Sequence, residues 1–508
     1  MADSFSQRFF ILKSLPQKFL ESLKGIEGFD RDAFVKIHES GEQITSIRVN
    51  PAKAVNGKRE TANSLIVNRE SSIGESFNFS LFNDSENQNE TSIHLSRFTS
   101  HDPVPWSQFG FYLKERPSFT FDPLFHAGLY YVQEASSMFL EQAFKQLVDL
   151  SKPIKVLDLC AAPGGKSTHI QSLISSESLL VSNEIIRSRN NILIDNLIKW
   201  GSSNVIVSNN DPSSFQKLEG YFDVMVVDAP CSGSGLFRKD EEAIDEWSLN
   251  NVQLCSQRQQ RILADAIPAL KENGILIYST CSYSKEEDEE IMDWLVDEME
   301  MKNEKLEIEN DWNIVETSSK TNSKGYRFYP DKLKGEGLFL ACFQKLSSTR
   351  DQKFRSGKIE KASAKEKNII EPWLKKVEYE LIKDNNSFFA LPSFLVNEYS
   401  ILKTAFNIQY KGTGIGQIMK DRLVPEHSLA LSTIFSDEIP FNELSYEQAI
   451  KYLQRQDVNL NTSGKGWQLV KYGDYNLGWI NVLPNRINNY YPKELRILKQ
   501  QNDSSFEK

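Results

Sequence analysis

The sequence predicts an α/β protein built around a mostly parallel sheet with helices on both faces. Two observations carry this prediction. Between residues 115 and 346, short apolar segments of strand length alternate with longer segments of helical periodicity, the pattern of repeated βαβ units. The chain also has 508 residues, 40% of them hydrophobic and 25% charged, which is too long for one ordinary core. We therefore expect additional domains on either side of the sheet.

The first region covers residues 1–114 and is expected to be a helper region, helical or mixed α and β. Apolar residues recur at helical spacing from Phe19 to Ile26, and Asn50-Pro51 predicts a break, so residues 1–70 are predicted to be mainly helical. Residues 71–100 are rich in Ser and Asn and lack periodicity, which is typical of a polar insertion.

The second region, residues 115–346, contains six apolar segments that we expect to form the sheet. Their bounds are Ile154–Leu159, Leu179–Asn183, Val205–Ser208, Val224–Asp228, Ile275–Ser279 and Leu338–Phe343. A charged linker is predicted at residues 347–368. Residues 369–508, rich in Tyr, Asn, Trp and Gly, are predicted to form a separate small α+β module.

Composition restricts the class of protein. No segment approaches the roughly 18 apolar residues that a membrane helix needs, and we see no secretory signal at the N-terminus. The five cysteines form no C-x-x-C pair, so we expect neither a disulfide framework nor a metal site, and a cytoplasmic location. The net charge is −10, but residues 286–309 alone carry −10, with 12 acids and two lysines. We interpret that segment as the solvated face of a helix, and overall charge does not exclude a nucleic-acid partner.

The first predicted strand runs into a glycine-rich turn and then a helix, which indicates a ligand site. The turn consists of Cys160, Ala161, Ala162, Pro163, Gly164, Gly165 and Lys166. Glycines let a ligand approach the backbone, and a helix N-terminus offers free N–H groups. The turn matches neither G-x-G-x-x-G nor a complete P-loop.

Acidic residues follow the next strands at the same edge of the sheet. Glu184 ends the second strand and can accept hydrogen bonds from ribose hydroxyls, and Asp211 after the third can meet the amine of an adenine. Each acid alone would be explained as a cap of a helix or turn. Because these acids follow successive strands at one edge of the sheet, together they predict an adenosine ligand without phosphates.

Two cysteines at the ends of later strands indicate nucleophilic chemistry. Asp228-Ala-Pro-Cys231 ends the fourth strand, and Ser279-Thr-Cys281 ends the fifth. Their Pro, Gly, Ser and Thr neighbours favour loops, where reactive residues occur. A thiolate that adds to C6 of a cytosine makes C5 able to attack a methyl sulfonium, and the reaction also needs an acid near N3 and a base for the C5 proton. Cys255 and Cys342, on apolar faces, are instead expected to be core residues.

These motifs resemble the NOL1/NOP2/Sun family of RNA cytosine-C5 methyltransferases. The matching segments are Asp158–Thr168, Asp228–Gly235, Ser279–Ser282 with Glu286–Glu289, and Tyr131–Ser137. The resemblance implies a Rossmann-like class I methyltransferase core that uses S-adenosyl-L-methionine. It implies that Cys281 is the nucleophile and that Cys231 assists proton removal and release. It also implies that residues 160–166, Glu184, Asp211 and Asp228 bind the cofactor and that Lys166 reaches the base.

The flanks resemble the bacterial RsmF/YebU group within that family. Ser46–Pro51, Arg327–Gly337 and the Trp- and Tyr-containing segments from Gly466 to Lys493 carry this likeness. It implies a C-terminal PUA-like RNA-binding module and small-subunit ribosomal RNA as the substrate, so that residues 1–114 are expected to help bind RNA. We expect the enzyme to be a monomer. The sequence departs from the family pattern at Asp288, Asp331 and Leu338.

Three alternatives remain open at this point. The same chemistry could act on transfer RNA. A methyltransferase core that has lost activity could serve as a ribosome-assembly RNA-binding protein, although such a core need not keep both cysteines. A DNA methyltransferase is disfavoured because the Pro-Cys motif is not followed by Gln.

Overall fold

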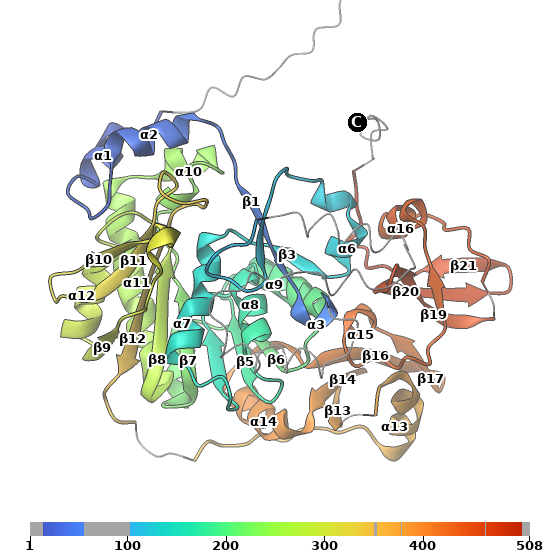
Figure 1. Ribbon diagram of the computed structural model, residues 1–508. Helices are drawn as coiled ribbons and strands as arrows, with labels where there is room; N and C mark the ends of the chain where they lie inside the picture. The colour runs from blue at the N-terminus through green and yellow to red at the C-terminus, as the bar shows by residue number, and fades with distance from the viewer. Residues whose placement is uncertain (1–13, 55–101, 350–352, 377, 463, 500–508) are drawn as a thin grey trace, which may run out of the picture.

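A ten-stranded sheet forms the centre of the molecule (Figure 1). The computed structural model describes residues 14–54, 102–349, 353–376, 378–462 and 464–499. The strand order is β10-β11-β12-β8-β7-β4-β5-β6-β15, and β9 also pairs with β12. The five middle strands, β8 to β6 in this order, are parallel, whereas β12 and β15 are antiparallel to their neighbours. The predicted Rossmann-like sheet is therefore confirmed in its parallel centre, and the antiparallel pairings at both edges make it a mixed sheet.

All six predicted strands are present. They are β4 (Lys155–Asp158), β5 (Leu179–Asn183), β6 (Val205–Ser208), β7 (Phe222–Asp228), β8 (Leu270–Thr280) and β12 (Leu338–Lys345). The sheet is completed by β9 (Met301–Glu304), β10 (Val315–Ser318), β11 (Lys324–Phe328) and β15 (Ile408–Lys411).

Helices cover both faces of this sheet. One face packs against α7 (Leu140–Leu147), α8 (Gly165–Leu173) and α9 (Arg187–Trp200). The other packs against α11 (Leu249–Ala266), α12 (Glu289–Asp297) and α14 (Val396–Ala405). A parallel sheet requires apolar cover on both sides, and each face carries its own hydrophobic cluster.

The N-terminal region is a mixture of helices and strands. Helices α1 (Gln17–Ser22) and α2 (Arg31–Glu39) precede a small sheet of β1 (Thr45–Val49), β2 (Gly110–Leu113) and β3 (Tyr130–Val132), in the order β2-β1-β3. The expectation that residues 1–70 are mainly helical is wrong for 45–49, because Ser46-Ile-Arg-Val lies in the central strand of this sheet. Asn50-Pro51 ends that strand and begins α3 (Pro51–Ala54). The predicted insertion at 71–100 lies outside the described residues.

Arg48 on β1 joins this small sheet to the core. It is fully buried, and its guanidinium donates hydrogen bonds to Gln133 Oε1 (2.8 Å) and Thr168 Oγ1 (2.6 Å) on the first turn of α8. The same group lies 4.4 Å from the centre of the Trp200 ring, at the end of α9. Arg48 therefore fixes the N-terminal sheet beside the glycine-rich turn.

The C-terminal residues form two four-stranded sheets and four helices. The first sheet has the order β13-β14-β16-β17 and the second β18-β19-β20-β21. Their strands are β13 (Tyr379–Asp384), β14 (Ser387–Pro392), β16 (Thr413–Met419), β17 (Arg422–Pro425), β18 (Phe441–Glu443), β19 (Gly466–Tyr472), β20 (Tyr475–Leu483) and β21 (Arg486–Asn489). The helices, besides α14, are α13 (Ala364–Ile370), α15 (His427–Leu431) and α16 (Tyr446–Leu453). Two short helices elsewhere complete the fold, α6 (Pro123–His126) and α10 (Glu241–Glu246).

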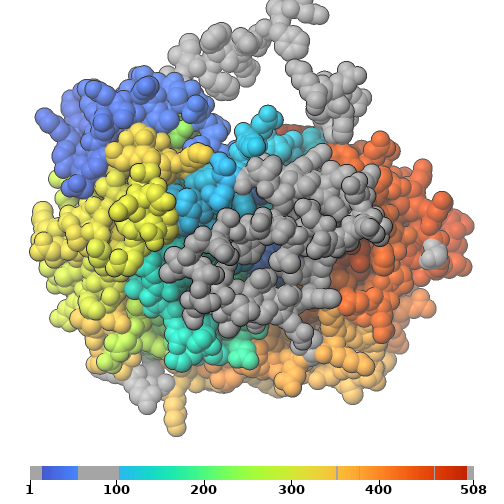
Figure 2. Space-filling model, in the orientation of Figure 1, coloured from blue at the N-terminus to red at the C-terminus, as the bar shows by residue number. Residues whose placement is uncertain are grey.

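The expectation of a separate C-terminal module is wrong for its first part. Strand β15 pairs with β6 at the edge of the central sheet, and α14 packs on the core. Helix α13 also begins inside the predicted linker of residues 347–368, at Ala364. In Figure 2 the C-terminal residues, orange to red, continue along the lower edge of the molecule beneath the core. Within the described ranges, no helix is long and apolar enough to cross a bilayer.

Candidate functional site

The glycine-rich turn lies between β4 and α8, as predicted. Gly164 is the residue before the helix and has a φ of +112°. Residues other than glycine rarely adopt this conformation. Two side chains from α9 hold the turn: Asn196 donates to the Pro163 carbonyl (2.8 Å) and Arg189 to the Ala162 carbonyl (2.8 Å). The backbone of the turn is thus fixed from the side of the sheet that carries α8 and α9.

Asp158 lies at the base of this turn and is fully buried. Ser167 donates to its Oδ2 (2.6 Å), but Oδ1 has no hydrogen-bond partner within the part of the chain that is described. Burial raises the pKa of this carboxyl to about 7, against the opposing effects of Ser167 and Lys166. A buried acceptor without a donor fits a ligand that brings one.

The two acids at the next strand ends have partners but also free acceptor capacity. Glu184 is 4% exposed, and its Oε1 accepts a hydrogen bond from the Ile186 amide (2.8 Å). Asp211 caps the turn that follows β6, since its Oδ1 accepts from the Ser213 amide (3.0 Å) and hydroxyl (2.7 Å), and these bonds lower its pKa. Both acids therefore cap local structure, and the second carboxylate oxygen of Glu184 lies 3.6 Å from the Arg189 guanidinium.

The predicted reactive cysteines come together. Cys231 Sγ, after β7, and Cys281 Sγ, after β8, are 3.0 Å apart, close enough for a thiol to donate to the other sulfur. Contact with the Cys281 sulfur and burial raise the Cys231 pKa well above its ordinary value. Cys255 and Cys342 are buried in α11 and β12, as predicted for core residues. All five cysteines are free thiols.

Asp228 and Lys166 form an ion pair beside the cysteines. Lys166 Nζ lies 2.8 Å from Asp228 Oδ2, and Ser279 Oγ donates to Oδ1 (2.8 Å). Burial opposes the charge of Lys166, but Asp228, through its charge and hydrogen bond, raises the Lys166 pKa above its usual value. Asp228 is the last residue of β7, and Lys166 belongs to the first turn of α8. The glycine-rich turn and the cysteine loops therefore share one site.

Glu287 is a site residue that the sequence interpretation missed. It is fully buried, and it accepts hydrogen bonds from the Ser232 amide (2.8 Å) and from the Ser282 hydroxyl (2.7 Å). Each serine directly follows one of the two cysteines, so this carboxylate joins both cysteine loops. Gln259 on α11 donates to the same group (3.1 Å). The only signal in the sequence was the family-like segment Glu286–Glu289.

The next acid, Asp288, is also buried, so the solvated-face interpretation is wrong for the start of segment 286–309. Asp288 accepts from the Thr280 hydroxyl (2.7 Å) and lies 3.0 Å from Arg327, which also pairs with Glu289. On α12, Ile291 and Leu295 are buried in the core, and Trp294 is half-buried against the same cluster. The departure from the family pattern at Asp288 therefore places a carboxylate beside the buried guanidinium of Arg327.

Gly235 shows how tightly the loops are packed. Its amide donates to the Cys281 carbonyl (2.8 Å). A Cβ at this position would lie 2.6 Å from the Gly337 carbonyl oxygen and 2.8 Å from that of Cys281. Only glycine permits this approach, which explains the second glycine of the Cys231-Ser-Gly-Ser-Gly235 motif. Within the described residues, no three His, Cys, Asp or Glu side chains gather as a metal site requires.

Comparisons with known proteins agree with this geometry. The family model for the 16S rRNA methyltransferase RsmB/F matches residues 146–344, that for the N-terminal domain of RsmF matches 70–135, and that for the RsmF PUA domain matches 440–497. The first of these covers the whole site. The match of the N-terminal model begins at residue 70 and so includes the segment expected to be an insertion.

Two curated relatives extend the likeness over most of the chain. The ribosomal RNA small subunit methyltransferase F of Vibrio atlanticus is 32% identical over 411 residues, which is 78% of this chain and 85% of the relative. The enzyme of the same name from Aliivibrio fischeri is 32% identical over 415 residues, with the same coverage. Among solved structures, that of PH0851 matches 65% of this chain and 66% of its own, with a TM-score of 0.51 and 23% identity, which shows a common fold.

The fold and the composition of the site define a class I methyltransferase that uses S-adenosyl-L-methionine. Within that class, the chain belongs to the family of ribosomal RNA small subunit methyltransferase F.

Proposed function

We propose that this chain methylates C5 of a cytosine in small-subunit ribosomal RNA, through a covalent bond between Cys281 and C6 of the base. The 3.0 Å contact between the sulfurs of Cys281 and Cys231, beside the ion pair of Asp228 and Lys166, is the observation that carries the proposal. The names of the relatives support ribosomal RNA as the substrate and the PUA model supports an RNA partner. The enzyme would then act in the cytoplasm as a monomer.

The residues around the turn fit the cofactor. Asp158 offers an unpartnered buried acceptor within the described residues, Asp211 has one carboxylate oxygen outside its capping bonds, and Glu184 can exchange its long contact with Arg189 (3.6 Å) for a ligand hydroxyl. Ile185, directly after Glu184, is 51% exposed and offers apolar surface to an adenine. When bound, S-adenosyl-L-methionine supplies a methyl group on a positively charged sulfur, which is an electrophile.

The chain's own groups then supply the remaining chemistry. The Cys281 thiolate forms a bond to C6, and the displaced electron pair makes C5 nucleophilic. Asp228 hydrogen-bonds N3, and Lys166 at 2.8 Å is a source for the proton that N3 takes up. After C5 has gained the methyl group it loses its proton, with Cys231 positioned to assist. The electrons of that bond restore the C5–C6 double bond, the Cys281 sulfur leaves, and N3 returns its proton.

Separate substitution of the two cysteines tests this assignment. Cys281→Ala should abolish methylation, because no adduct forms, and should leave cofactor affinity nearly unchanged. Cys231→Ala should accumulate a protein–RNA species in the presence of S-adenosyl-L-methionine, because elimination stalls. That species should survive denaturing electrophoresis, since a carbon–sulfur bond holds it. Cys255→Ala is the matched control and should turn over normally.

The opposite results are equally informative. Trapped RNA in Cys281→Ala would reverse the two roles, as in DNA cytosine methyltransferases. Loss of cofactor binding in both variants, with no trapped RNA, would make the cysteines structural and favour a ribosome-assembly protein without activity. Bisulfite sequencing of ribosomal and transfer RNA from a strain that lacks the gene identifies the RNA. Loss of 5-methylcytosine from transfer RNA alone would overturn the proposed substrate.

A further inference from the structure

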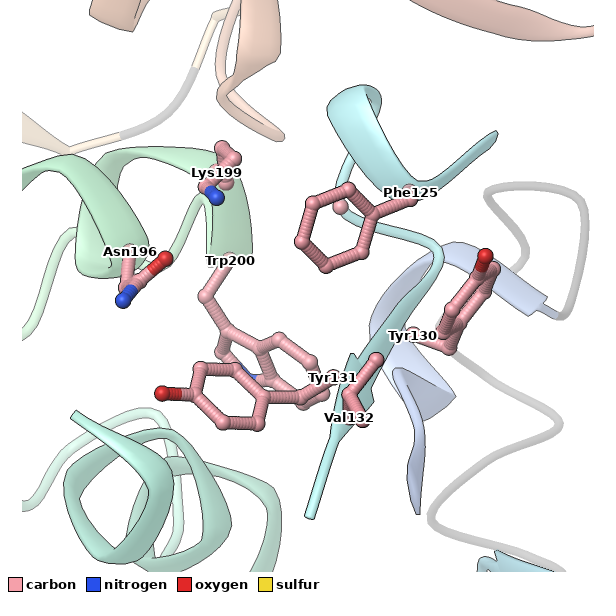
Figure 3. A pocket seen from close by; sticks show the side chains of 8 residues that line it. Phe125, Tyr130, Tyr131, Val132, Asn196, Lys199 and Trp200 are labelled. Atoms are coloured by element: carbon pink, nitrogen blue, oxygen red, sulfur yellow. The ribbon is translucent and has the colours of Figure 1, made fainter. Parts of the chain in front are cut away.

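A small aromatic pocket lies beside the glycine-rich turn, outside the catalytic cluster (Figure 3). Its volume is about 140 Å³, which is room for one planar ring system. The lining residues that matter here are Phe125, Tyr131, Val132, Asn196, Lys199 and Trp200. In Figure 3 Phe125 and Lys199 face each other across the hollow, with Tyr131 and Trp200 below them, and Tyr130 points away.

The chemistry of this lining suits a nucleobase with its phosphate. The rings of Phe125 and Tyr131 offer surface for stacking, which accepts any base, whereas Trp200 is 2% exposed and the Arg48 guanidinium covers one face of its ring. Asn196 uses its amide nitrogen to hold Pro163, so its carbonyl oxygen is available to accept a hydrogen bond from a base. The Lys199 ammonium lies 4.8 Å from the centre of the Phe125 ring, and none of the residues that line the pocket is acidic. The lining itself thus contains one cation and no acid, although Asp195, one turn earlier on α9, acts on the charge of Lys199.

The position of the pocket connects it to the reaction. Asn196 holds the Pro163 carbonyl, and a Cβ on Gly165 would lie 3.4 Å from the Tyr131 ring, so the pocket shares a wall with the turn. On the other side, Phe125 belongs to α6, which packs against the second C-terminal sheet and α16. RNA that contacts both the C-terminal module and the catalytic core would pass this pocket.

We propose that this pocket holds one unpaired base of the RNA substrate, next to but distinct from the cytosine that is methylated. The inference rests on the proposed function, since it presumes an RNA substrate. The bound base would stack on the rings of Phe125 and Tyr131, while Lys199 contacts its phosphate. The pocket would thereby fix the register of the RNA relative to the cysteines.

Substitution of Phe125 tests the stacking, because its ring lines the pocket and is only partly buried against its hydrophobic cluster. Phe125→Leu should raise the KM for small-subunit ribosomal RNA roughly 5- to 100-fold, the range expected for one lost base–aromatic stack, and leave the Kd for S-adenosyl-L-methionine within about twofold. Phe125→Tyr keeps the ring and should restore the KM. Phe119→Leu is the matched control: Phe119 is partly buried in the same cluster, with its ring centre 6.2 Å from that of Phe125, but does not line the pocket.

Photocrosslinking identifies the base directly. Ribosomal RNA transcribed with 4-thiouridine or 6-thioguanosine should crosslink to a peptide that contains Phe125 or Tyr131, at one nucleotide other than the methylated cytosine. RNA with an abasic residue at that nucleotide should show the raised KM with the wild-type enzyme. The same RNA should cause no further increase with Phe125→Leu, because the contact is already lost.

The outcomes separate this inference from the proposed function. A wild-type enzyme that does not methylate ribosomal RNA would overturn the proposed function and, with it, the basis of this inference. Normal methylation combined with an unchanged KM in Phe125→Leu, or with equal effects in Phe119→Leu, would overturn the base pocket alone. A crosslink of the target cytosine itself to this peptide would also overturn it, because the pocket would then belong to the catalytic site.

Discussion

Glu287 determines the relative position of the two reactive sulfurs although it touches neither. Its carboxylate accepts hydrogen bonds from Ser232 and Ser282, and burial raises its pKa even though these bonds oppose the rise. Removal of the charge leaves the shape of the side chain but weakens bonds that a charged acceptor makes about twice as strong as a neutral one. Glu287 is therefore a positioning residue.

The variant Glu287→Gln should lower kcat about 10- to 100-fold, because charge-assisted hydrogen bonds are worth roughly 1.5–3 kcal/mol each. The KM for S-adenosyl-L-methionine should change little. Alkylation of Cys231 and Cys281 by iodoacetamide, followed by mass spectrometry, should show altered relative rates. An unchanged kcat with unchanged alkylation would exclude this role.

The buried Asp158 predicts a pH dependence of stability. Its folded-state pKa is raised from 3.8 to about 7 by burial, so the unfolded chain loses this proton at lower pH than the folded protein does. The contribution of the neutral carboxyl to stability is complete below pH 4 and is lost as the pH rises toward 7, by up to roughly 1.4 kcal/mol per unit.

Asp158→Asn removes this titration. The difference between the urea midpoints of variant and wild type, both without cofactor, should therefore grow in favour of the variant from pH 4 to 7 and stay constant above. Measurements at five pH values between 4 and 8.5 check this expectation. A difference that is independent of pH would show that the carboxyl does not titrate in this range.

At the scale of residues, the sequence sorted the cysteines correctly because strand ends, prolines and glycines are visible in it. The contacts of Glu287 and Asp288 could not be predicted, since a run of acids in a sequence is usually solvated. Here a buried arginine, Arg327, and two serine hydroxyls offset the burial of these acids. Arg327 and Ser232 are distant from them in the chain, whereas Ser282 lies only five residues before Glu287.

At the scale of elements, apolar runs located the six predicted strands because buried parallel strands are apolar on both faces. Strand β15 escaped prediction. Its residues, Ile408-Gln-Tyr-Lys411, are half polar, and its partner β6 lies about 200 residues earlier in the chain. Strand β1 was missed in the sequence because helical segments lie on either side of it.

Because β15 and α14 pack on the core, we expect Phe406, which lies between these two elements in the chain, to contribute strongly to the stability of the fold. Its ring centre is 4.4 Å from that of Phe215, and both side chains are buried. Phe406→Ala should destabilise the core by about 3–5 kcal/mol and lower the melting temperature by roughly 5–15 °C. Phe441→Ala, at a side chain that is 57% exposed, is the control and should have little effect. Equal melting temperatures for both variants would mean that this part of the C-terminal region does not support the core.

At the scale of the whole molecule, the C-terminal region performs two tasks. Its first part completes the central sheet, and its second part contains the PUA match at residues 440–497. A deletion from residue 387 would therefore remove β15 and α14 together with the PUA module, and would not isolate RNA binding. Substitution of exposed cations avoids this problem.

Three exposed basic side chains follow β21, namely Lys493, Arg496 and Lys499. If they contact phosphates, their combined replacement by Gln should reduce the slope of log affinity against log salt by about 2, since each contact with single-stranded RNA contributes about 0.7. The melting temperature should stay the same, because none of the three is buried. Filter-binding titrations at several salt concentrations measure the slope. An unchanged slope would place the phosphate contacts elsewhere on the surface.

The pairing of β15 with β6 has a consequence for synthesis on the ribosome. Strand β6 leaves the exit tunnel about 200 residues before its partner does, a delay of roughly 10–40 s at ordinary elongation rates. During that interval one edge of the central sheet exposes unpaired backbone groups, which is a hazard for aggregation. We therefore expect the nascent chain to depend on ribosome-associated chaperones until residue 411 has emerged. An enzyme that modifies ribosomal RNA would then itself need protection at the ribosome that makes it.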